Sequence, residues 1–356
     1  MKEAVMFYLG LDMHKKTSYV TLMDQAGAVL QQQRVPSTRT SIGALIDGFP
    51  KPLHVALEAT RNWYWMYDFL ADKVQDIKLA HPPKTKLIAE ARIKTDKLDS
   101  RILADLLRTN YLPTCYVPDP ETRQRRELLR HRAYLIRIRV ALKNRIHAML
   151  AKLGIEHTYE DLFTKQGMEF LHNLELPWAY QKALTDDLSL IEDINTKDRI
   201  LQRKIRQLCK ATPLTEILMS LPGIAYHNAL LIISEVGDIN RFPDGAHFAS
   251  YCGLVTQVHI SDQTVHYGGI TRNGNRWLRW LYVEASFFAR RYSYRFGHLY
   301  ERVKNRAGVQ KAIVAVAREM AVVTYYMLKR NQKFRDHKIK AEGTAICESD
   351  PLEVVQ

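Results

Sequence analysis

Four acidic residues stand where a sheet and a following helix could bring carboxylates together: Asp12, Glu58, Asp96 and Asp99. The first two directly follow apolar runs typical of buried strands, at 5–11 and 53–57. The other two are three residues apart at the predicted start of a helix, so they share one helical face. Crowded carboxylates repel one another and stay ionised only when cations compensate them. The pattern therefore predicts an acidic site at the carboxyl edge of a sheet.

Such a site would suit metal-dependent cleavage of phosphodiester bonds. Oxygen ligands favour Mg²⁺ or Mn²⁺ over zinc, and two such ions about 3.5 to 4 Å apart activate the attacking oxygen and stabilise the leaving one. Each acid alone has an ordinary explanation, as a strand end, a surface acid or a helix cap. The four together favour catalysis, with Asp12, Glu58, Asp96 and Asp99 as catalytic residues and metal ligands.

An α/β domain over residues 1–112 must position these acids. We expect strands near 5–11, 17–23, 28–35, 53–58 and 77–80, and helices around 41–48, after Asn62 and from Asp96. A three-stranded meander followed by strands that alternate with helices predicts a mixed sheet whose catalytic edge lies at the strand C-termini. Pro113, Pro118 and Pro120 then mark a linker.

A helical, coiled-coil arm is expected over residues 113–215. Apolar residues recur at helical spacing from 121 to about 153, and a second helical stretch near 188–208 could pack back antiparallel. Residues 123–152 hold ten Lys or Arg and one acid, whereas a helix surface selected only for solubility would mix signs. We therefore expect this arm to bind nucleic acid through Arg123, Arg126, Arg130, Arg137, Lys143 and Arg145.

A mainly helical domain is expected over residues 216–335, followed by a flexible tail at 336–356. Its turn at 221–225 resembles a helix-hairpin-helix turn, in which Gly223 would present backbone N–H groups to phosphate, although Pro-Gly turns are common elsewhere. Residues 265–335 hold fifteen Lys or Arg and three acids. The candidate phosphate contacts are Arg272, Arg276, Arg279, Lys304, Arg306 and Lys311. The interleaved aromatic residues could stack on bases or pack in the core: Trp277, Trp280, Tyr282 and Tyr292.

The overall composition points to a polyanionic partner. The 356 residues carry a formal net charge of +14, which favours nucleic acid or an anionic membrane surface. No uncharged apolar run reaches the roughly 18 residues of a spanning helix, and the N-terminal residues run straight into a strand without a signal-peptide layout. We therefore expect a cytoplasmic protein with no membrane anchor. The four cysteines are far apart, so neither a disulfide framework nor a zinc site is predicted.

Short motifs occur along nearly the whole chain. In its first half they are Gly10-Leu11-Asp12, Leu57-Glu58-Ala59-Thr60, Lys94-Thr95-Asp96-Lys97-Leu98-Asp99, Arg126-Glu127-Leu128-Leu129-Arg130 and Leu142-Lys143-Asn144-Arg145-Ile146-His147. In its second half they are Leu221-Pro222-Gly223-Ile224, Tyr251-Cys252-Gly253-Leu254, Gly274-Asn275-Arg276-Trp277-Leu278-Arg279 and Lys311-Ala312-Ile313-Val314-Ala315-Val316-Ala317-Arg318. Together they resemble the DEDD insertion-sequence transposases, a family that includes pilin-gene invertases and recombinases guided by a bridge RNA.

This resemblance implies a RuvC-like domain with the RNase H fold, a coiled-coil arm and a C-terminal transposase domain that carries a serine nucleophile. It assigns the DEDD tetrad to Asp12, Glu58, Asp96 and Asp99, with Mg²⁺ or Mn²⁺ as the cofactor. The partners that it implies are donor and target DNA, a noncoding guide RNA and further copies of the chain in a dimer or tetramer.

The nucleophile is placed at Ser261 by its distance from the family's Gly-Leu pair and from the downstream Gly-Asn-x-x-Leu-Arg motif. The chain departs from the family pattern nearby. The usual Ser-Gly is Ser261-Asp262, the usual Thr-Pro-Arg is Val255-Thr256-Gln257, and the lysine before Gly-Asn is replaced in Arg272-Asn273-Gly274-Asn275. Arg272 keeps the charge, but arginine and lysine are not equivalent at phosphate.

The leading interpretation is a DNA transposase or recombinase of a mobile insertion sequence. Three alternatives remain open on the sequence. One is a site-specific DNA invertase of the same fold. Another is a nuclease like the Holliday-junction resolvases, which would need the tetrad but no serine. The third is a noncatalytic nucleic-acid-binding protein with a decayed tetrad.

Overall fold

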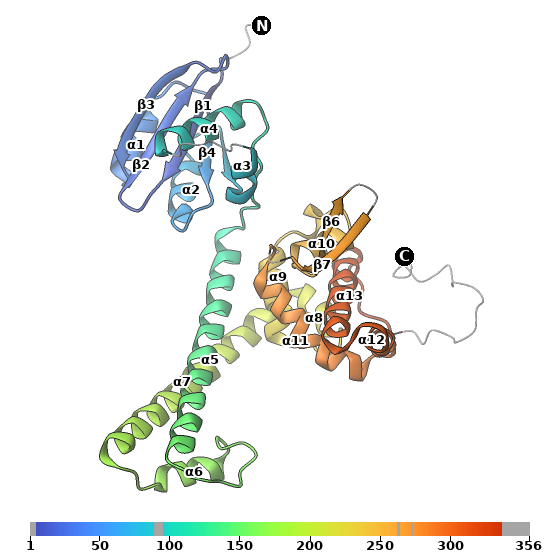
Figure 1. The fold of residues 1–356 in the computed structure, drawn as a ribbon. Coiled ribbons are helices and arrows are strands. Elements are labelled where there is room, and N and C mark those ends of the chain that lie inside the picture. Colours follow the sequence, from blue (N-terminus) through green and yellow to red (C-terminus); the bar gives the residue numbers. More distant parts are fainter. Residues whose placement is uncertain (1–4, 89–94, 262–263, 272, 337–356) are drawn as a thin grey trace, which may run out of the picture. The chain divides into compact units, whose positions relative to one another are not determined.

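The structure, a computed structural model, describes residues 5–88, 95–261, 264–271 and 273–336. The chain divides into two compact units, Met1–Pro118 and the part from Asp119 onward, and each is described by itself. Figure 1 shows a sheet flanked by helices in the first unit and a mostly helical second unit. Among the described residues, no helix is both long and apolar enough to span a bilayer.

A five-stranded mixed sheet forms the centre of the first unit (Figure 1). The strands are β1 (Phe7–Met13), β2 (Thr17–Met23), β3 (Val29–Pro36), β4 (Leu53–Glu58) and β5 (Asp76–Ala80). Their order is β3-β2-β1-β4-β5. The first three strands pair antiparallel, and β4 and β5 continue the sheet parallel to β1. The predicted mixed sheet is therefore confirmed.

Helices cover both faces of this sheet. They are α1 (Arg39–Asp47), α2 (Trp63–Ala71), α3 (Pro82–Ile88) and α4 (Asp96–Arg108). Side chains alternate between the faces of a strand, so Leu9 and Leu11 of β1 pack in one core with Ile42 of α1 and Met66 of α2. A separate cluster that includes Leu103 attaches α4 to the sheet. The helix that carries two of the acids thus packs on the face opposite α1 and α2.

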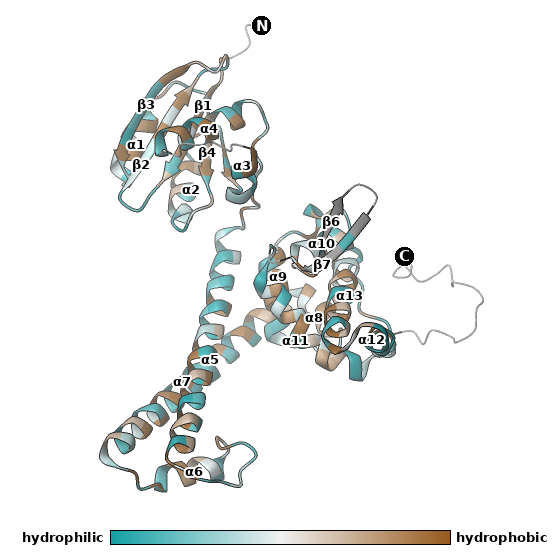
Figure 2. Ribbon diagram, in the orientation of Figure 1, coloured by the Kyte–Doolittle hydropathy of each residue, from teal (hydrophilic) through white to brown (hydrophobic). Residues whose placement is uncertain are grey.

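Two helices of 33 residues each, α5 (Pro120–Lys152) and α7 (Trp178–Lys210), pack together in the second unit. They are antiparallel, because Arg132 pairs with Asp198 whereas Arg145, further along α5, pairs with Asp187. The short helix α6 (Lys165–Asn173) joins them through an apolar cluster. Figure 2 shows hydrophobic and hydrophilic residues mixed along both long helices. The helix α7 begins well before the stretch predicted near 188–208.

The remaining elements of the second unit are mostly helical, as predicted. They are α8 (Pro213–Met219), α9 (Tyr226–Val236), the 3-10 turn Ile239–Arg241, α10 (Gly245–Tyr251), β6 (Thr256–Ser261), β7 (Thr264–Ile270), α11 (Arg276–Tyr292), α12 (Tyr294–Ala307) and α13 (Val309–Arg330). The helix α13 contributes more buried residues to the core than any other element, and its Val316, Ala317 and Met320 are fully buried. The antiparallel β6–β7 hairpin connects α10 to α11. The predicted tail lies, from residue 337, outside the described residues.

Candidate active site

Asp12 lies near the end of β1 and is only 5% exposed. Its neighbours Leu11 and Met13 point into the core shared with α1 and α2, so strand alternation places Asp12 on the face that α4 covers. Strand β4 runs parallel to β1 with Leu57 opposite Leu11. Glu58, the last residue of β4, therefore reaches the same edge of the sheet.

The first turn of α4 supplies the other two acids. Thr95 caps this helix, because its side chain accepts a hydrogen bond from the backbone N–H of Leu98 at 3.2 Å. Asp96 and Asp99 follow in the first turn, where acids interact favourably with the helix dipole. The sequence folds this way locally because the cap and both acids favour a helix start at the same place.

Gly10 explains how α4 comes so close to the strand. A Cβ at Gly10 would lie 1.9 Å from the carbonyl oxygen of Ser100 and 2.6 Å from the amide nitrogen of Ala104, so any side chain there would push the helix away. A buried hydrogen bond of 2.7 Å between the Thr21 and Ser100 hydroxyls fixes the same contact. The missing side chain thus lets α4 rest directly on β1 beside Asp12.

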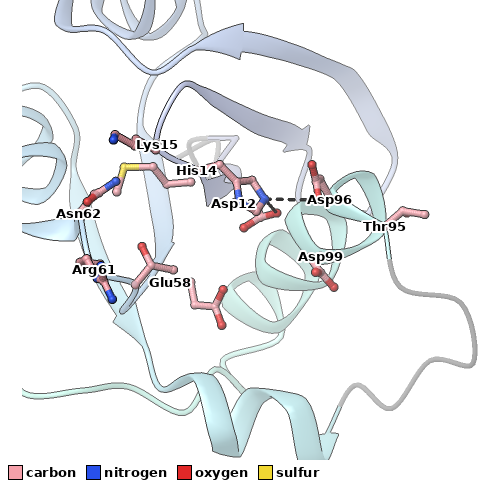
Figure 3. A pocket seen from close by; sticks show the side chains of 11 residues that line it. Asp12, His14, Lys15, Glu58, Arg61, Asn62, Thr95, Asp96 and Asp99 are labelled. Atoms are coloured by element: carbon pink, nitrogen blue, oxygen red, sulfur yellow. Dashed lines mark ion pairs between the residues drawn. The ribbon is translucent and has the colours of Figure 1, made fainter.

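Figure 3 shows Asp12 and Asp96 approaching one another from the strand and the helix, with His14 between them. The His14 Nε2 atom is 3.3 Å from Oδ2 of Asp12 and 3.3 Å from Oδ1 of Asp96. All four predicted acids, including Glu58 and Asp99, line one pocket of about 460 Å³. The structure therefore brings together residues that are up to 87 positions apart in the sequence.

His14 is part of this pocket, although the sequence-based prediction did not include it. The sequence does hold a relevant pattern, because His14 stands two residues after Asp12. In an extended chain, residues at that spacing point to the same side. A histidine there remains close to Asp12 just beyond the end of β1.

The electrostatics of the pocket favour a bound cation. Burial raises the pKa of Asp12 to about 6, His14 opposes this increase, and the carboxylates of Asp96, Asp99 and Glu58 add to it. One potential ligand atom from each of Asp12, His14 and Asp96 can be chosen so that all lie within 4.8 Å of one another. Carboxylate oxygens with one imidazole nitrogen suit a divalent cation, so the residues present fit a metal site.

Several cations of α5 that were predicted to bind nucleic acid have partners inside the second unit. Arg126 and Arg130 bind the end of α9, and Arg145 pairs with Asp187 at 3.1 Å. Arg123 is buried. Part of the basic run along this helix thus holds the protein together, which its one-sided charge did not indicate.

Two further cations of α5 lie over aromatic rings. Arg137 is exposed and lies 5.3 Å from the centre of the Tyr134 ring. The Lys143 ammonium lies 4.3 Å from the centre of the Phe163 ring. Of the six arm residues proposed from the sequence, Arg137 combines high exposure with a position on the middle turns of the helix.

The predicted helix-hairpin-helix-like turn lies between α8 and α9. Gly223 has φ +85°, and a Cβ there would lie 2.6 Å from the carbonyl oxygen of Ala285 in α11. The glycine is therefore required by the conformation of the turn and by its close packing against α11. These constraints account for its presence without a phosphate contact.

The cations predicted in the last domain have different environments. Arg276 is exposed at the start of α11, whereas Arg279 donates a hydrogen bond to the carbonyl oxygen of Thr271 at 3.1 Å. Lys304 pairs with Glu301. The other two predicted contacts, Arg306 and Lys311, are exposed. Arg272 lies outside the described residues.

The aromatic residues of α11 divide between core and surface. Tyr282 is fully buried and Trp277 packs against the core, so for these two the core interpretation is correct. Trp280 is 46% exposed and Tyr292 is 74% exposed. Only the latter two offer a ring face of the kind that stacking on a base requires.

Ser261 is the last residue of β6, paired with Thr264 across the hairpin. The structure describes its backbone.

Two transposase family models match this chain. The model for the DEDD transposases of IS110 elements matches residues 9–155, which contain the acidic pocket. The model of the IS116/IS110/IS902 transposase family matches residues 215–301, which contain the β6–β7 hairpin. The two units of the structure thus each contain transposase sequence.

Curated relatives extend the similarity over most of the chain. The transposase for insertion sequence element IS1111A of Coxiella burnetii is 23% identical over 355 residues, which cover 92% of this chain and 91% of the relative. The transposase for IS1328 of Yersinia enterocolitica is 22% identical and covers 84% of this chain and 88% of its own. An IS110 protein of Streptomyces coelicolor is 30% identical over 142 residues, 40% of this chain and 35% of its own.

The family models and these relatives are transposases, so the chain is a transposase, an enzyme that cuts and rejoins DNA. Residues 9–155 and 215–301 are transposase domains of the IS110/IS116 family, and transposases of insertion sequences are similar over most of the chain.

Proposed function

We propose that the acidic pocket cuts DNA with the help of divalent metal and that Ser261 holds one strand covalently between cutting and rejoining. The observation that supports this most is Asp12, a buried carboxylate whose pKa is raised to about 6 in a pocket lined by three more acids. A protein gains no stability from gathering carboxylates in this way. A bound cation would offset the repulsion between these carboxylates and complete the proposed catalytic site.

Asp12, Glu58, Asp96 and Asp99 would hold the cations, either Mg²⁺ or Mn²⁺, with His14 as a nearby nitrogen ligand. When bound, these ions supply Lewis-acid stabilisation of the attacking and leaving oxygens at phosphorus. Lys15 and Arg61 line the same pocket, and their charges can orient the DNA backbone beside the carboxylates. The protein side chains thus provide both the metal ligands and the phosphate contacts.

Ser261 would attack the phosphorus with its side-chain oxygen. A bond forms between that oxygen and phosphorus, the bond to one strand oxygen breaks, the leaving oxygen gains a proton, and a base takes the serine proton. Rejoining is the reverse reaction, in which a strand hydroxyl attacks the phosphoserine and releases Ser261. The place of Ser261 at the end of β6, in the segment that matches the second family model, supports this role.

We further propose that the first domain, residues 1–112, has the RNase H-like fold of RuvC. Its three antiparallel strands followed by two parallel strands with intervening helices support this assignment. Residues 113–215 would form the arm and residues 216–335 the transposase domain with the serine. The long antiparallel pair α5 and α7 supports a separate arm.

The proposed partners are donor and target DNA, a noncoding guide RNA and other copies of this chain in a dimer or tetramer. The net charge of +14 and the exposed cations Arg276, Arg306 and Lys311 support binding to polyanions. Nucleic acid that copurifies with the protein should be extracted and sequenced. One discrete RNA supports guided recombination, whereas random fragments contradict a dedicated guide.

The experiment that tests the chemistry uses a supercoiled plasmid that carries this coding sequence with its flanking DNA, incubated with Mg²⁺ or Mn²⁺. The variants are Asp12→Asn and Ser261→Ala. Asp72→Asn and Ser250→Ala, which change exposed residues outside the proposed site, are the matched controls. Cleavage is followed on agarose, and covalent protein–DNA adducts are followed on denaturing gels.

We expect Asp12→Asn to abolish both cleavage and adduct, and Ser261→Ala to abolish the adduct, while both controls stay active. Cleavage that persists in Ser261→Ala without any adduct would identify a resolvase-like nuclease. Metal binding that is the same in Asp12→Asn and in the unaltered protein would contradict the catalytic role of the pocket.

A further inference from the structure

A second buried carboxylate, Glu235, lies in the second unit near the end of α9 and is 1% exposed. Arg130 of α5 donates to its Oε1 atom from Nη2 at 2.7 Å and from Nε at 3.1 Å. Asn275, before α11, donates to Oε2 at 2.8 Å. One carboxylate therefore connects three separate elements of the unit.

The backbone carbonyl groups of Ser234 and Glu235 also accept hydrogen bonds from α5. Arg126 of α5 donates to the carbonyl oxygen of Ser234 at 2.6 Å and to that of Glu235 at 3.0 Å. These carbonyls belong to the last turn of α9, where a cation interacts favourably with the helix dipole. The Tyr251 hydroxyl donates to the same Glu235 carbonyl at 3.1 Å. We call Glu235, Arg126, Arg130 and Asn275 the Glu235 clamp.

The Glu235 clamp is attached to both ends of the β6–β7 hairpin. Tyr251 ends the helix before β6, and Asn275 precedes the helix after β7. The two residues also bind one another, because the backbone N–H of Asn275 donates to the backbone carbonyl oxygen of Tyr251 at 2.7 Å. The chain therefore enters and leaves the hairpin at a point that contacts Glu235 from both sides.

The two chain segments that join the β6–β7 hairpin to α10 and α11 form its base, and their backbones pack closely. A Cβ at Gly274 would lie 2.7 Å from the Cα atom of Gly253, and φ is +116° at Gly274 and +70° at Gly253. The Thr271 amide donates to the Val255 carbonyl at 2.9 Å. Because the two segments at its base pack so closely, the contacts that hold Tyr251 and Asn275 set the orientation of the hairpin.

We propose that Glu235 is a positioning residue that fixes the β6–β7 hairpin, and with it Ser261, relative to the helix α5. The catalytic part of this inference rests on the proposed role of Ser261. A buried carboxylate would be unfavourable without well-oriented partners, and hydrogen bonds to charged groups are short and directional. An apolar residue would fill the same space but would not set the angle between the three elements.

A comparison of Glu235→Gln with Asp198→Asn tests this role. Asp198 is also buried and pairs with two arginines, Arg132 and Arg139. It joins α7 to α5, however, and does not contact the hairpin base. The exchange rates of backbone amides in β6 and β7 are measured by mass spectrometry for the full-length variants, together with their melting temperatures. Adduct formation on the plasmid substrate is measured in parallel.

We expect hairpin amides to exchange about tenfold faster in Glu235→Gln and to remain unchanged in Asp198→Asn, because local opening depends on nearby contacts. Adduct formation should fall in Glu235→Gln while nucleic-acid binding is kept. Equal hairpin exchange in both variants would overturn the inference and leave Glu235 as a contributor to stability alone.

Asn275→Ser provides a variant that keeps the fold even if Glu235→Gln does not. Serine still caps α11, because it is a good N-cap residue, but its shorter side chain cannot span the distance to Glu235. Faster hairpin exchange with an unchanged helix is expected, and unchanged exchange would contradict the proposal. If Ser261→Ala still forms the adduct, the proposed nucleophile is wrong, whereas the exchange rates still decide whether Glu235 positions the hairpin.

Discussion

Asp12 and Glu235 are both buried carboxylates, one in each unit of the molecule, yet their surroundings are opposite. Glu235 receives hydrogen bonds from the guanidinium of Arg130 and the amide of Asn275. Asp12 has His14 beside it and three further acids near enough to raise its pKa. A buried acid that the protein itself neutralises serves the framework, whereas one placed among other acids requires a cation from outside. The neighbours of a buried acid thus distinguish a structural role, as for Glu235, from the metal-binding role proposed for Asp12.

The largest effect is expected for catalysis. Asp12→Asn should reduce plasmid cleavage by about 10³-fold or more, because charge stabilisation at the reacting phosphate is lost. Glu235→Gln should reduce cleavage less, since it displaces the reacting group without removing a metal ligand. Initial rates on the same plasmid measure both. Equal losses in the two variants would remove the distinction between the two acids.

Stability should change in opposite directions at the two sites. Glu235→Gln is expected to lower the free energy of unfolding by about 1 to 3 kcal/mol, since the partly buried Arg126 and Arg130 lose their counterion. Asp12→Asn should raise that of the metal-free protein at pH 8, because it removes a buried charge among like charges. Urea unfolding of both variants measures the difference. Destabilisation by Asp12→Asn would show that the acidic pocket is neutralised within the protein.

The pH dependence of the metal-free protein should reveal Asp12. Its carboxyl has a pKa of about 6 in the folded state, against 3.8 as the reference value, so the folded protein holds more protons between these values. The free energy of unfolding should therefore fall by about 3 kcal/mol as pH rises from about 4 to 6, and the loss should persist above pH 6. Asp12→Asn should flatten this part of the curve. A curve that is the same in both proteins would exclude the pKa shift.

Divalent metal should stabilise the protein only when the pocket is intact. At a Mn²⁺ concentration of about 100 times the dissociation constant, binding adds about 2.7 kcal/mol. The melting temperature should rise more at pH 8 than at pH 5, because protons compete with the cation for Asp12. Asp72→Asn should respond like the unaltered protein and Asp12→Asn should not. An equal rise in Asp12→Asn would place the metal elsewhere.

The smallest effect is expected on the arm, where exposed and paired arginines can be compared. Arg137→Gln should reduce the slope of nucleic-acid affinity against salt by up to about 1, as for one lost phosphate contact, with little change in stability. Arg132→Gln should lower stability, because Arg132 pairs with the buried Asp198, and should leave the slope unchanged. Fluorescence anisotropy with labelled DNA across a salt series measures the slopes. The reverse result would assign packing to Arg137 and nucleic-acid binding to Arg132.

The local pattern of the sequence predicted the sheet well, because alternating and continuous apolar runs define β1, β2 and β4 through their own residues. The acids of the pocket were also predicted from local pattern, since Asp12 and Glu58 lie at the ends of neighbouring parallel strands and Asp96 and Asp99 share a helix face. The contact between α4 and β1 was not predictable, because it depends on the space at Gly10 and on the Thr21–Ser100 hydrogen bond. Such long-range packing leaves no periodic pattern.

Charge patterns were less reliable than apolar ones. The basic run on α5 indicated a nucleic-acid surface, but Arg126, Arg130 and Arg145 bind acceptors on α9 and α7. Those acceptors lie more than 40 residues away, so a count along one helix could not reveal them. The β6–β7 hairpin was not predicted, because the segment around Ser261 is mostly polar and the domain was expected to be mainly helical.

Gly10 carries no functional group, yet the width of the acidic pocket depends on it. One added methyl would meet the Ser100 carbonyl at 1.9 Å, so the helix bearing Asp96 and Asp99 would have to retreat from the strand bearing Asp12. The four carboxylates would keep their chemistry, but the distances between them would change. A residue with no reactive group can thus set the spacing on which the proposed metal binding depends.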